Sequence, residues 1–249
     1  MSNAPPSATS DLKMSEPVTT SPRSRNSQAE TVASELMLAI HQHRILPGTK
    51  LGEDELADIF SVSRTIIRSA LQSLGHHQLV EIQRNRGAFV AQPSVREAHE
   101  VFEARVLMEP GLARRAAERT QPDDLALLQR HIKDEHDALA AGDQGRALHL
   151  SGLFHIEIAR IADHATLAAF VEALIARSSL IIALYWRRQS ALCEKHAHHA
   201  LLDALGSGDG QAAEELMKSH LVDLHSALEL RERPKPARSL KEALGTPHT

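Results

Sequence analysis

The sequence predicts a mainly α-helical protein in two parts. A small N-terminal domain of three helices and a β-hairpin is followed by an all-α antiparallel bundle of six to seven helices. Apolar residues recur at helical spacing through most of the chain, and two short segments before residue 92 alternate apolar and polar side chains as half-buried strands do. After residue 95, short breaks rich in Gly, Pro or Asp separate the helical segments, which favours antiparallel neighbours.

Composition and charge set wide limits on function. The chain has 249 residues, enough for one large or two modest domains, and 42% of them are hydrophobic, which supports buried cores. The single Cys193 excludes an internal disulfide framework and suits the reducing cytoplasm, where we expect the protein to reside. We identify no apolar run of the roughly 18 residues that span a bilayer, so no membrane partner is expected. The formal net charge of −4 does not point to nucleic acid.

The N-terminal region divides into a tail and a domain. The segment 1–27 is rich in Ser, Pro and Thr, so we expect a disordered tail. The first domain is expected at 28–92. Its first helix closes at Pro47-Gly48, and a short amphipathic helix, Glu53–Phe60, then leads into a tight turn.

The third helix is the stretch around which this domain is organised. We expect Ser63 to be its N-cap, with the hydroxyl accepting an amide of the first turn. On one face Arg64, Thr65 and Arg68 should be exposed, as in the recognition helix of a helix-turn-helix. An ordinary surface helix with solvated arginines would show the same pattern. The opposite, apolar stripe consists of Ile67, Ala70, Leu71 and Leu74.

Two predicted strands, Leu79–Gln83 and Ala88–Ala91, follow the third helix. The turn between them contains Gly87, which can take a positive φ, and Arg86, which must face solvent. Three helices followed by a basic hairpin is the order of a winged helix-turn-helix. Such a module presents its third helix to the major groove of DNA.

The second domain is expected at 95–232, and 233–249 is expected to be a flexible tail. Pro122 fits the first turn of a helix, and Asp143 and Asp209 stand where N-caps would. The predicted helical segments lie near 95–119, 123–141, 144–162, 165–187, 190–206 and 209–231.

Several motifs resemble those of the GntR family of bacterial repressors. In the first domain these are Leu46–Leu51, Glu55–Ala57, Val62–Thr65, Arg68 with Ala70-Leu71, and Arg86–Val90. In the second domain, Arg105–Glu109, Phe154-His155 and the stretch from His198 to His220 are similar to the ligand-binding (FCD) domain of the FadR-type subfamily. The resemblance spans about 28–231. It implies a ligand-responsive regulator, commonly a repressor, that binds a short palindromic operator in double-stranded DNA as a homodimer.

Three of the sixteen histidines stand on inward faces of separate predicted helices: His155, His198 and His220. Neutral imidazoles suit Zn²⁺ or Ni²⁺, and the resemblance implies these three as ligands of one divalent ion per subunit. The subfamily usually has an Asp four residues before the first of them, where this chain has Ser151, a poorer ligand. Water or the effector could complete the shell. Alternatively, the histidines could bind an organic anion directly, without a metal.

Arg105 is the other candidate for the effector site. In the subfamily the matching Arg reaches the ligand cavity, where a guanidinium suits a carboxylate. A structural salt bridge to Glu109 explains this residue equally well. Tyr185 and Trp186 could line the cavity or fill the core. Exposed positions are expected for His41, His43, His76, His77, His131 and His136.

The sequence therefore predicts a DNA-binding regulator and not an enzyme. We expect Arg64, Thr65 and Arg68 to enter the major groove, and Arg86 and Gly87 to carry the wing towards the minor groove. Two alternatives remain. A helical metal-dependent hydrolase could use the three histidines, although no His-Asp dipeptide supports it. An effector-independent architectural DNA binder would leave the inward polar residues unexplained. The effector, the target genes and the direction of regulation are not specified by the sequence.

Overall fold

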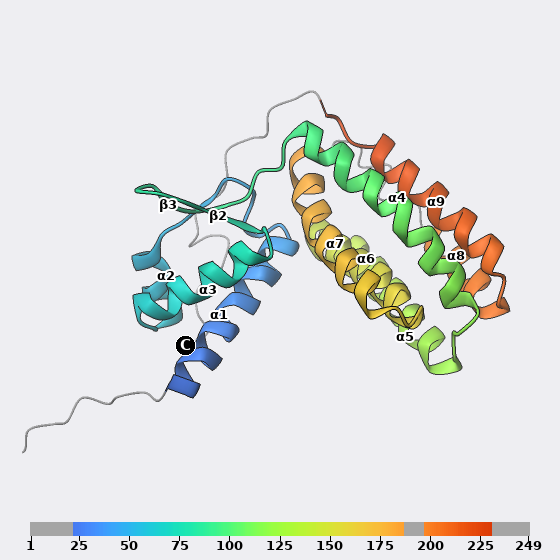
Figure 1. Cartoon of the computed structure of the whole chain (residues 1–249), viewed down its shortest axis with the longest axis horizontal. Helices are drawn as coiled ribbons and strands as arrows, with labels where there is room; N and C mark the ends of the chain where they lie inside the picture. The colour runs from blue at the N-terminus through green and yellow to red at the C-terminus, as the bar shows by residue number, and fades with distance from the viewer. Residues whose placement is uncertain (1–21, 187–196, 231–249) are drawn as a thin grey trace, which may run out of the picture.

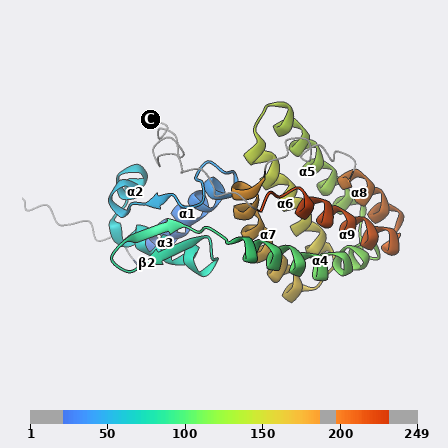
Figure 2. The ribbon, with the colours of Figure 1, turned by 90° about the horizontal axis from the view of Figure 1, so that it is seen from above.

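The computed structural model describes residues 22–186 and 197–230, in two domains that lie side by side (Figures 1 and 2). The N-terminal domain contains α1 (Pro22–His41), β1 (Lys50–Leu51), α2 (Glu53–Phe60), α3 (Arg64–His76), β2 (Val80–Gln83) and β3 (Gly87–Val90). The helical domain contains α4 (Val95–Ala117), α5 (Pro122–Ala140), α6 (Gln144–Ile161), α7 (Ala165–Tyr185), α8 (Ala197–Ser207) and α9 (Gly210–Ser226). This order confirms the predicted fold class.

The element boundaries differ from the sequence expectation at several places, among them the end of α9, which stops at Ser226 whereas the helix was expected to run to about residue 231. Helix α1 begins at Pro22, whereas the first domain was expected to begin at residue 28. Helix α8 begins at Ala197, and the preceding part of the helix expected at 190–206 lies outside the described residues. Strand β1 was not predicted. The tail expected at 233–249 and most of the tail expected at 1–27 also lie outside the described residues.

Helix α3 is held by its apolar stripe. The four residues expected there are all buried, together with Ile66. Ser63 stands at the N-cap with an extended backbone, but its side chain makes no capping hydrogen bond, so the prediction for its hydroxyl was wrong. Its backbone carbonyl accepts from the amides of Ile66 (3.0 Å) and Ile67 (3.2 Å) instead, and the side chain is exposed.

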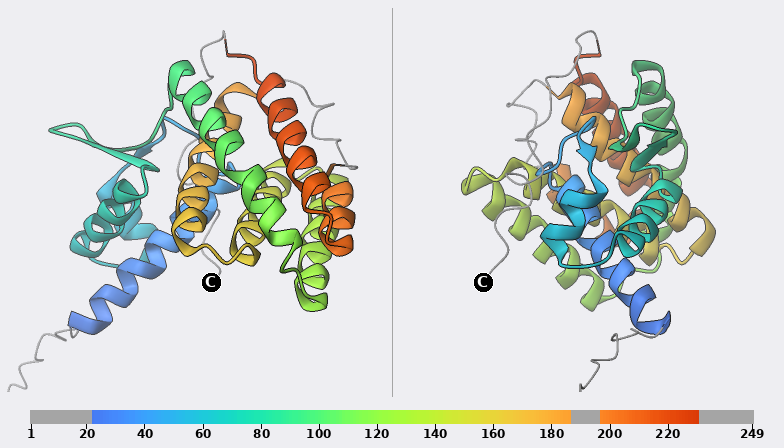
Figure 3. Two further views of the ribbon diagram at one scale, coloured as in Figure 1. Left: turned by 45° about the vertical axis from the view of Figure 1, so that its right-hand side comes forward. Right: turned by 90° about the vertical axis from the view of Figure 1, so that its left-hand side faces the viewer.

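The sheet of the N-terminal domain has the order β1-β3-β2 and is antiparallel. Gln83 pairs with Gly87 across a three-residue loop, and Asn85 within the loop has φ 62°. Gly87 has φ 97°, so the predicted positive φ is confirmed. The β2–β3 hairpin projects away from the helical domain, which leaves the loop accessible (Figure 3).

In the helical domain α4 and α9 lie side by side (Figure 3). Phe154 of α6 is fully buried in the core with Leu201 of α8 and Met217 of α9. By length and composition alone, α7 is the one helix among the described residues that could cross a membrane. Glu172 and Arg177 interrupt the helix, so it contains no unbroken apolar run of that length. In the structure α7 packs against α4 and α6.

Helix α7 also joins the two domains. Its Leu180 is buried in the hydrophobic core of the N-terminal domain. The His43 ring donates from Nε2 to the backbone carbonyl oxygen of Ser179 (3.0 Å). The Tyr185 hydroxyl donates a hydrogen bond to the carbonyl oxygen of Pro93 (2.9 Å). Its ring is buried in a hydrophobic cluster, so of the two roles considered for Tyr185 it has the one in the core.

Candidate DNA-contacting surface and effector cavity

The exposed face of α3 carries the residues expected to read DNA. Arg64 and Arg68 keep 55% and 58% of their side-chain surface exposed, and Thr65 is exposed beside them. In the hairpin loop Arg86 is exposed with its guanidinium 5.7 Å from the centre of the Phe89 ring. These positions agree with an outward basic surface in a winged helix-turn-helix.

Two acidic residues of α2 neutralise this surface in the free protein. Glu53 Oε2 lies 2.8 Å from Arg68 Nε and 3.5 Å from an Arg64 amino group, and Asp54 lies 3.1 Å from the other amino group of Arg64. The hydrogen bond from Arg68 lowers the pKa of Glu53, so this carboxylate stays ionised. Exposed ion pairs contribute little stability, which means that phosphates or bases can replace the carboxylates at low cost.

The three predicted metal ligands come together in the helical domain. His155, His198 and His220 are buried, and one ring nitrogen of each lies within 4.8 Å of those of the other two. His198 Nε2 is 3.3 Å from His220 Nε2. Two nitrogens on a tetrahedral ion with bonds of about 2.0–2.1 Å would be separated by about 3.3–3.4 Å, so this spacing fits a bound ion.

Carboxylates orient two of these histidines. His155 Nδ1 lies 2.6 Å from Glu109 Oε2, and His198 Nδ1 lies 2.9 Å from Glu135 Oε2. A proton held on Nδ1 leaves Nε2 with a lone pair, as the ligands of a metal require. His155 Nε2 is buried and has no hydrogen-bond partner among the described residues. The donor set and its orientation therefore fit a divalent metal ion.

Arg105 is almost fully buried on α4 and combines the two roles considered for it. Its Nε donates to Glu109 Oε1 (2.5 Å), a second nitrogen donates to Glu109 Oε2 (3.3 Å), and a third donates to Ser178 Oγ (3.2 Å). Its side chain also lines a cavity. Because these bonds use three of the five guanidinium protons, two donors remain for a ligand.

The cavity has a volume of about 440 Å³, which is within the range of small-molecule sites. At one end it is lined by Arg105, Ser151 and His155. Of the three histidines His155 is the one that lines it, while His198 and His220 contact His155 with ring centroids 5.6 and 5.2 Å away. The Arg105 end of the cavity and the three-histidine cluster therefore share one residue, His155.

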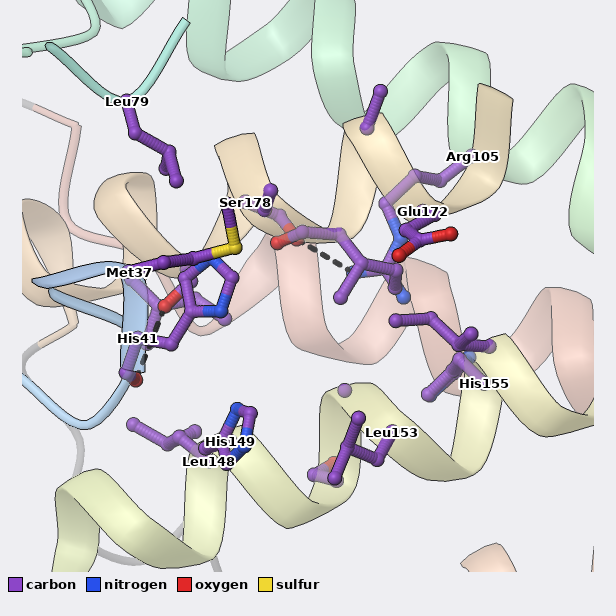
Figure 4. A pocket seen from close by; sticks show the side chains of 18 of the residues that line it. Met37, His41, Leu79, Arg105, Leu148, His149, Leu153, His155, Glu172 and Ser178 are labelled. Atoms are coloured by element: carbon purple, nitrogen blue, oxygen red, sulfur yellow. Dashed lines mark hydrogen bonds between the residues drawn. The ribbon is translucent and has the colours of Figure 1, made fainter. Parts of the chain in front are cut away.

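The other end of the cavity contains residues that sequence reasoning missed. Met37 and His41 of α1 line it together with His149 of α6 (Figure 4). His77 and Leu79, which follow α3, also belong to the wall. His41 and His77 were both expected to be exposed: His77 is exposed as expected, whereas His41 is half-buried, so the expectation for His41 was wrong. No sequence pattern identifies them, because α6 is far from α1 in the sequence and lies near it only in the folded chain.

Burial keeps the cavity histidines neutral. Burial, followed by the charges of neighbouring histidines, lowers the pKa of His41 to about 4, and burial also lowers the pKa of His149. Burial together with His198 and His155 lowers the pKa of His220 well below its usual value. Neutral imidazoles can coordinate a metal ion or exchange hydrogen bonds with a ligand.

The chain is similar in sequence to known bacterial regulators. Residues 28–90 match the family described as "Bacterial regulatory proteins, gntR family", and residues 100–223 match the "FCD domain". The chain is 27% identical over 211 residues to the HTH-type transcriptional regulator LutR of Bacillus subtilis, across 76% of this chain and 95% of the relative. It is 29% identical to the galactonate operon transcriptional repressor of Escherichia coli, across 69% of this chain and 84% of the relative.

A solved structure has the same fold. E. coli McbR/YncC superposes with a TM-score of 0.71 at 20% sequence identity, across 80% of this chain and 95% of the other. The order of the two matched domains, the outward arginines of α3 and the cavity of the helical domain agree with this relationship. The chain belongs to the GntR family of bacterial transcriptional regulators, with a winged helix-turn-helix and an FCD ligand-binding domain.

Proposed function

We propose that this regulator represses its target genes and releases or engages its operator in response to a small carboxylate bound in the cavity of the helical domain. The choice of a carboxylate as effector rests on Arg105, whose buried guanidinium lines the cavity and retains hydrogen-bond donors. Charge-assisted bonds from a guanidinium are strong and suit the planar carboxylate group. Arg64, Thr65 and Arg68 would contact the major groove, with Ser63 at the helix start and Arg86 and Gly87 in the wing.

We propose that His155, His198 and His220 hold one divalent ion, Zn²⁺ or Ni²⁺. The orientation of His155 and His198 by carboxylates supports this assignment. When bound, the ion would offer open coordination positions to an anionic ligand. Ser151 lines the cavity where an Asp ligand is usual in the subfamily, so the three histidines would be the protein ligands.

A homodimer that reads a palindromic operator is the proposed assembly. Large apolar side chains are exposed at Leu107 of α4, Phe170 of α7 and Val222 of α9, and such side chains are commonly covered by partners. Two-fold symmetry of the protein would then match two half-sites on the DNA. The cytoplasm is the compartment in which such a regulator meets its operator.

A role in gene regulation explains the buried carboxylates better than hydrolysis does. Glu109 and Glu135 hydrogen-bond to imidazole Nδ1 atoms, and this is a positioning role rather than that of a general base facing a substrate. We therefore propose that the chain is not an enzyme.

The test is binding to the DNA upstream of the chain's own coding sequence, measured by fluorescence anisotropy. We expect salt-sensitive binding, and Arg64→Ala and Arg68→Ala should each weaken it by roughly ten- to a hundredfold, as loss of a base contact does. Arg130→Ala on α5, which changes an exposed arginine of the other domain, is the matched control. Equal affinity of all four proteins would exclude α3 as the reading helix.

A further inference from the structure

The cavity has polar residues at both ends, and the two ends belong to different domains. Arg105 and His155 of the helical domain line one end. At the other end His41 of the DNA-binding domain faces His149 of α6, with their ring centroids 5.8 Å apart (Figure 4). A single ligand that fills this cavity would therefore contact both domains.

The His41 end has the character of an open hydrogen-bonding site. His41 Nε2 is buried, yet among the described residues no hydrogen-bond partner satisfies it. A buried polar nitrogen without a partner is costly, and such atoms are usually satisfied by protein, water or ligand. His149 and His77 line the same wall, so a group that reaches His41 meets further imidazoles.

The chemistry of this end favours an uncharged group. The pKa of His41 is lowered to about 4 and that of His149 is lowered as well, in both cases mainly by burial, so both rings are neutral near pH 7. A neutral imidazole can donate one hydrogen bond and accept another. A hydroxyl can serve both functions, whereas a second carboxylate could only accept, which would leave an imidazole lone pair without a donor and place an uncompensated charge in the cavity.

Apolar side chains line the middle of the cavity. Apart from its two polar ends and Glu172, the wall is largely apolar and includes Leu148, Leu153, Ile156, Ile175 and Ala176, with Met37 reaching in from α1. In Figure 4 Met37 and Leu153 point into the space between the His41 and His155 ends. A hydrocarbon segment fits such a wall better than a polyhydroxylated chain, because buried hydroxyls would find few partners there.

From this arrangement we infer that the effector is an elongated carboxylate with an apolar middle and a hydroxyl at its far end. Its carboxylate binds at Arg105, and its hydroxyl exchanges hydrogen bonds with His41 and His149. The bound molecule thereby connects the DNA-binding domain to the helical domain. This inference rests on the proposed effector role of the cavity and specifies the class of ligand.

The experiment compares two series of probes on the full-length protein: straight-chain alkanoic acids, and ω-hydroxyalkanoic acids of matching length. Binding is measured by isothermal titration calorimetry. At the best chain length the ω-hydroxy acid should bind about three- to tenfold more tightly than its partner, which corresponds to one additional net hydrogen bond. His41→Leu and His149→Leu should each bring the ratio of the two affinities close to one.

The controls separate this inference from the proposed function. His99→Leu, an exposed histidine of α4, should retain the preference for the hydroxy acid. If His41→Leu does not fold, His149→Leu provides the same test from the helical domain. A preference that survives both Leu substitutions, or the failure of every probe to bind, would overturn the inference. Operator binding by the same protein preparations tests the regulator function independently of these outcomes.

Discussion

The carboxylate of Glu109 connects Arg105, the proposed effector-binding residue, to the three-histidine cluster. It accepts hydrogen bonds from the Arg105 guanidinium and lies 2.6 Å from His155 Nδ1. Burial would raise its pKa, but the charge of Arg105 and the contact with His155 outweigh burial and lower the pKa to about 2. Glu109 is therefore ionised near neutral pH and balances the buried charge of Arg105.

Replacing Glu109 by Gln should affect both stability and metal affinity. The change leaves Arg105 without its buried counter-charge, so we expect a loss of about 3 kcal/mol in the free energy of unfolding. His155 also loses the acceptor that fixes its tautomer, which should weaken metal binding about 10- to 100-fold. Urea unfolding and elemental analysis after growth with added Zn²⁺ measure the two effects. Glu103→Gln, an exposed change on the same helix, should alter neither.

Two half-buried histidines between the domains, His41 and His43, should make stability depend on pH. The pKa values of His41 and His43 are lowered from 6.5 to about 4, chiefly by burial, so between these values the unfolded chain binds more protons than the folded protein. Their contribution to stability is present above pH 6.5 and is lost as the pH falls towards 4.

We therefore expect the free energy of unfolding to decrease as the pH is lowered across this window, by up to about 1.4 kcal/mol per pH unit for each such histidine. In His41→Leu the slope should be smaller than in wild type, which urea titrations at several pH values would show. Parallel slopes for the two proteins would indicate that His41 is already exposed to solvent in the folded state.

The sequence was a good guide to residues whose role depends on their own helix. The arginines of α3 and the three inward histidines could be predicted from periodicity and resemblance, and the structure exposes the former and clusters the latter. His41 and His149 could not be predicted, because their role arises from the contact between two helices that are far apart in the sequence. Ser63 was mispredicted since a backbone carbonyl can satisfy the same amides as a hydroxyl.

At the scale of the elements, two glycines of α6 permit the close packing that forms the cavity. A Cβ at Gly145 would overlap the carbonyl oxygen of Gln42, just beyond the end of α1. A Cβ at Gly152 would lie 2.9 Å from Ile175 Cγ2 of α7. The absent side chains thus let α6 approach both the DNA-binding domain and α7.

Substitution of Gly145 by Ala should force α1 and α6 apart. We expect a destabilisation of about 1–3 kcal/mol, as for other overpacked contacts, despite the better helix propensity of Ala. Thermal unfolding measures the change. Gly111→Ala on α4 is the control, because a Cβ there meets no atom of the described chain within 4 Å, and it should stabilise by up to about 1 kcal/mol. Equal melting temperatures for the two variants would mean that the α1–α6 contact yields easily.

The elements themselves were predicted with uneven success, for physical reasons. Long amphipathic helices and the hairpin repeat their pattern often enough to be recognised. Strand β1 has two residues, Lys50 and Leu51, which is too short for any alternation to be visible, and pairing with β3 creates it. The extension of α1 to Pro22 passes through a polar stretch that composition alone assigns to the tail.

In the molecule as a whole, α7 is placed to transmit effector binding to the DNA-binding domain. Ser178 of α7 faces Arg105 in the cavity, and the next two residues of the helix contact the other domain, Ser179 at His43 and Leu180 in the core. Arg177 donates to the backbone carbonyl of Gln78 (2.6 Å) and to Glu97 of α4. Movement of α7 by a ligand would therefore reach the segment between α3 and the hairpin.

Arg177→Ala should weaken this connection without removing either binding site. We expect operator affinity in the absence of effector to change by less than about threefold, while the ratio of operator affinities with and without effector, commonly about 5- to 150-fold, moves towards one. Anisotropy titrations with the carboxylate that binds best in a thermal-shift screen measure the ratio. Arg160→Ala, which removes a surface pair with Glu157 inside α6, is the control. An unchanged ratio in Arg177→Ala would place the coupling elsewhere.

The shared wall of the cavity limits how freely such regulators can be recombined. A chimera joined between Val90 and Val95 would contain a complete DNA-binding domain and a complete helical domain. The parent that supplies the DNA-binding domain would, however, also supply the cavity residues Met37, His41, His77 and Leu79. The operator sequence bound by the hybrid would be that of one parent, whereas its effector cavity would be lined by residues from both parents. Grafting these four side chains along with the bundle is the design rule that follows for biosensor construction.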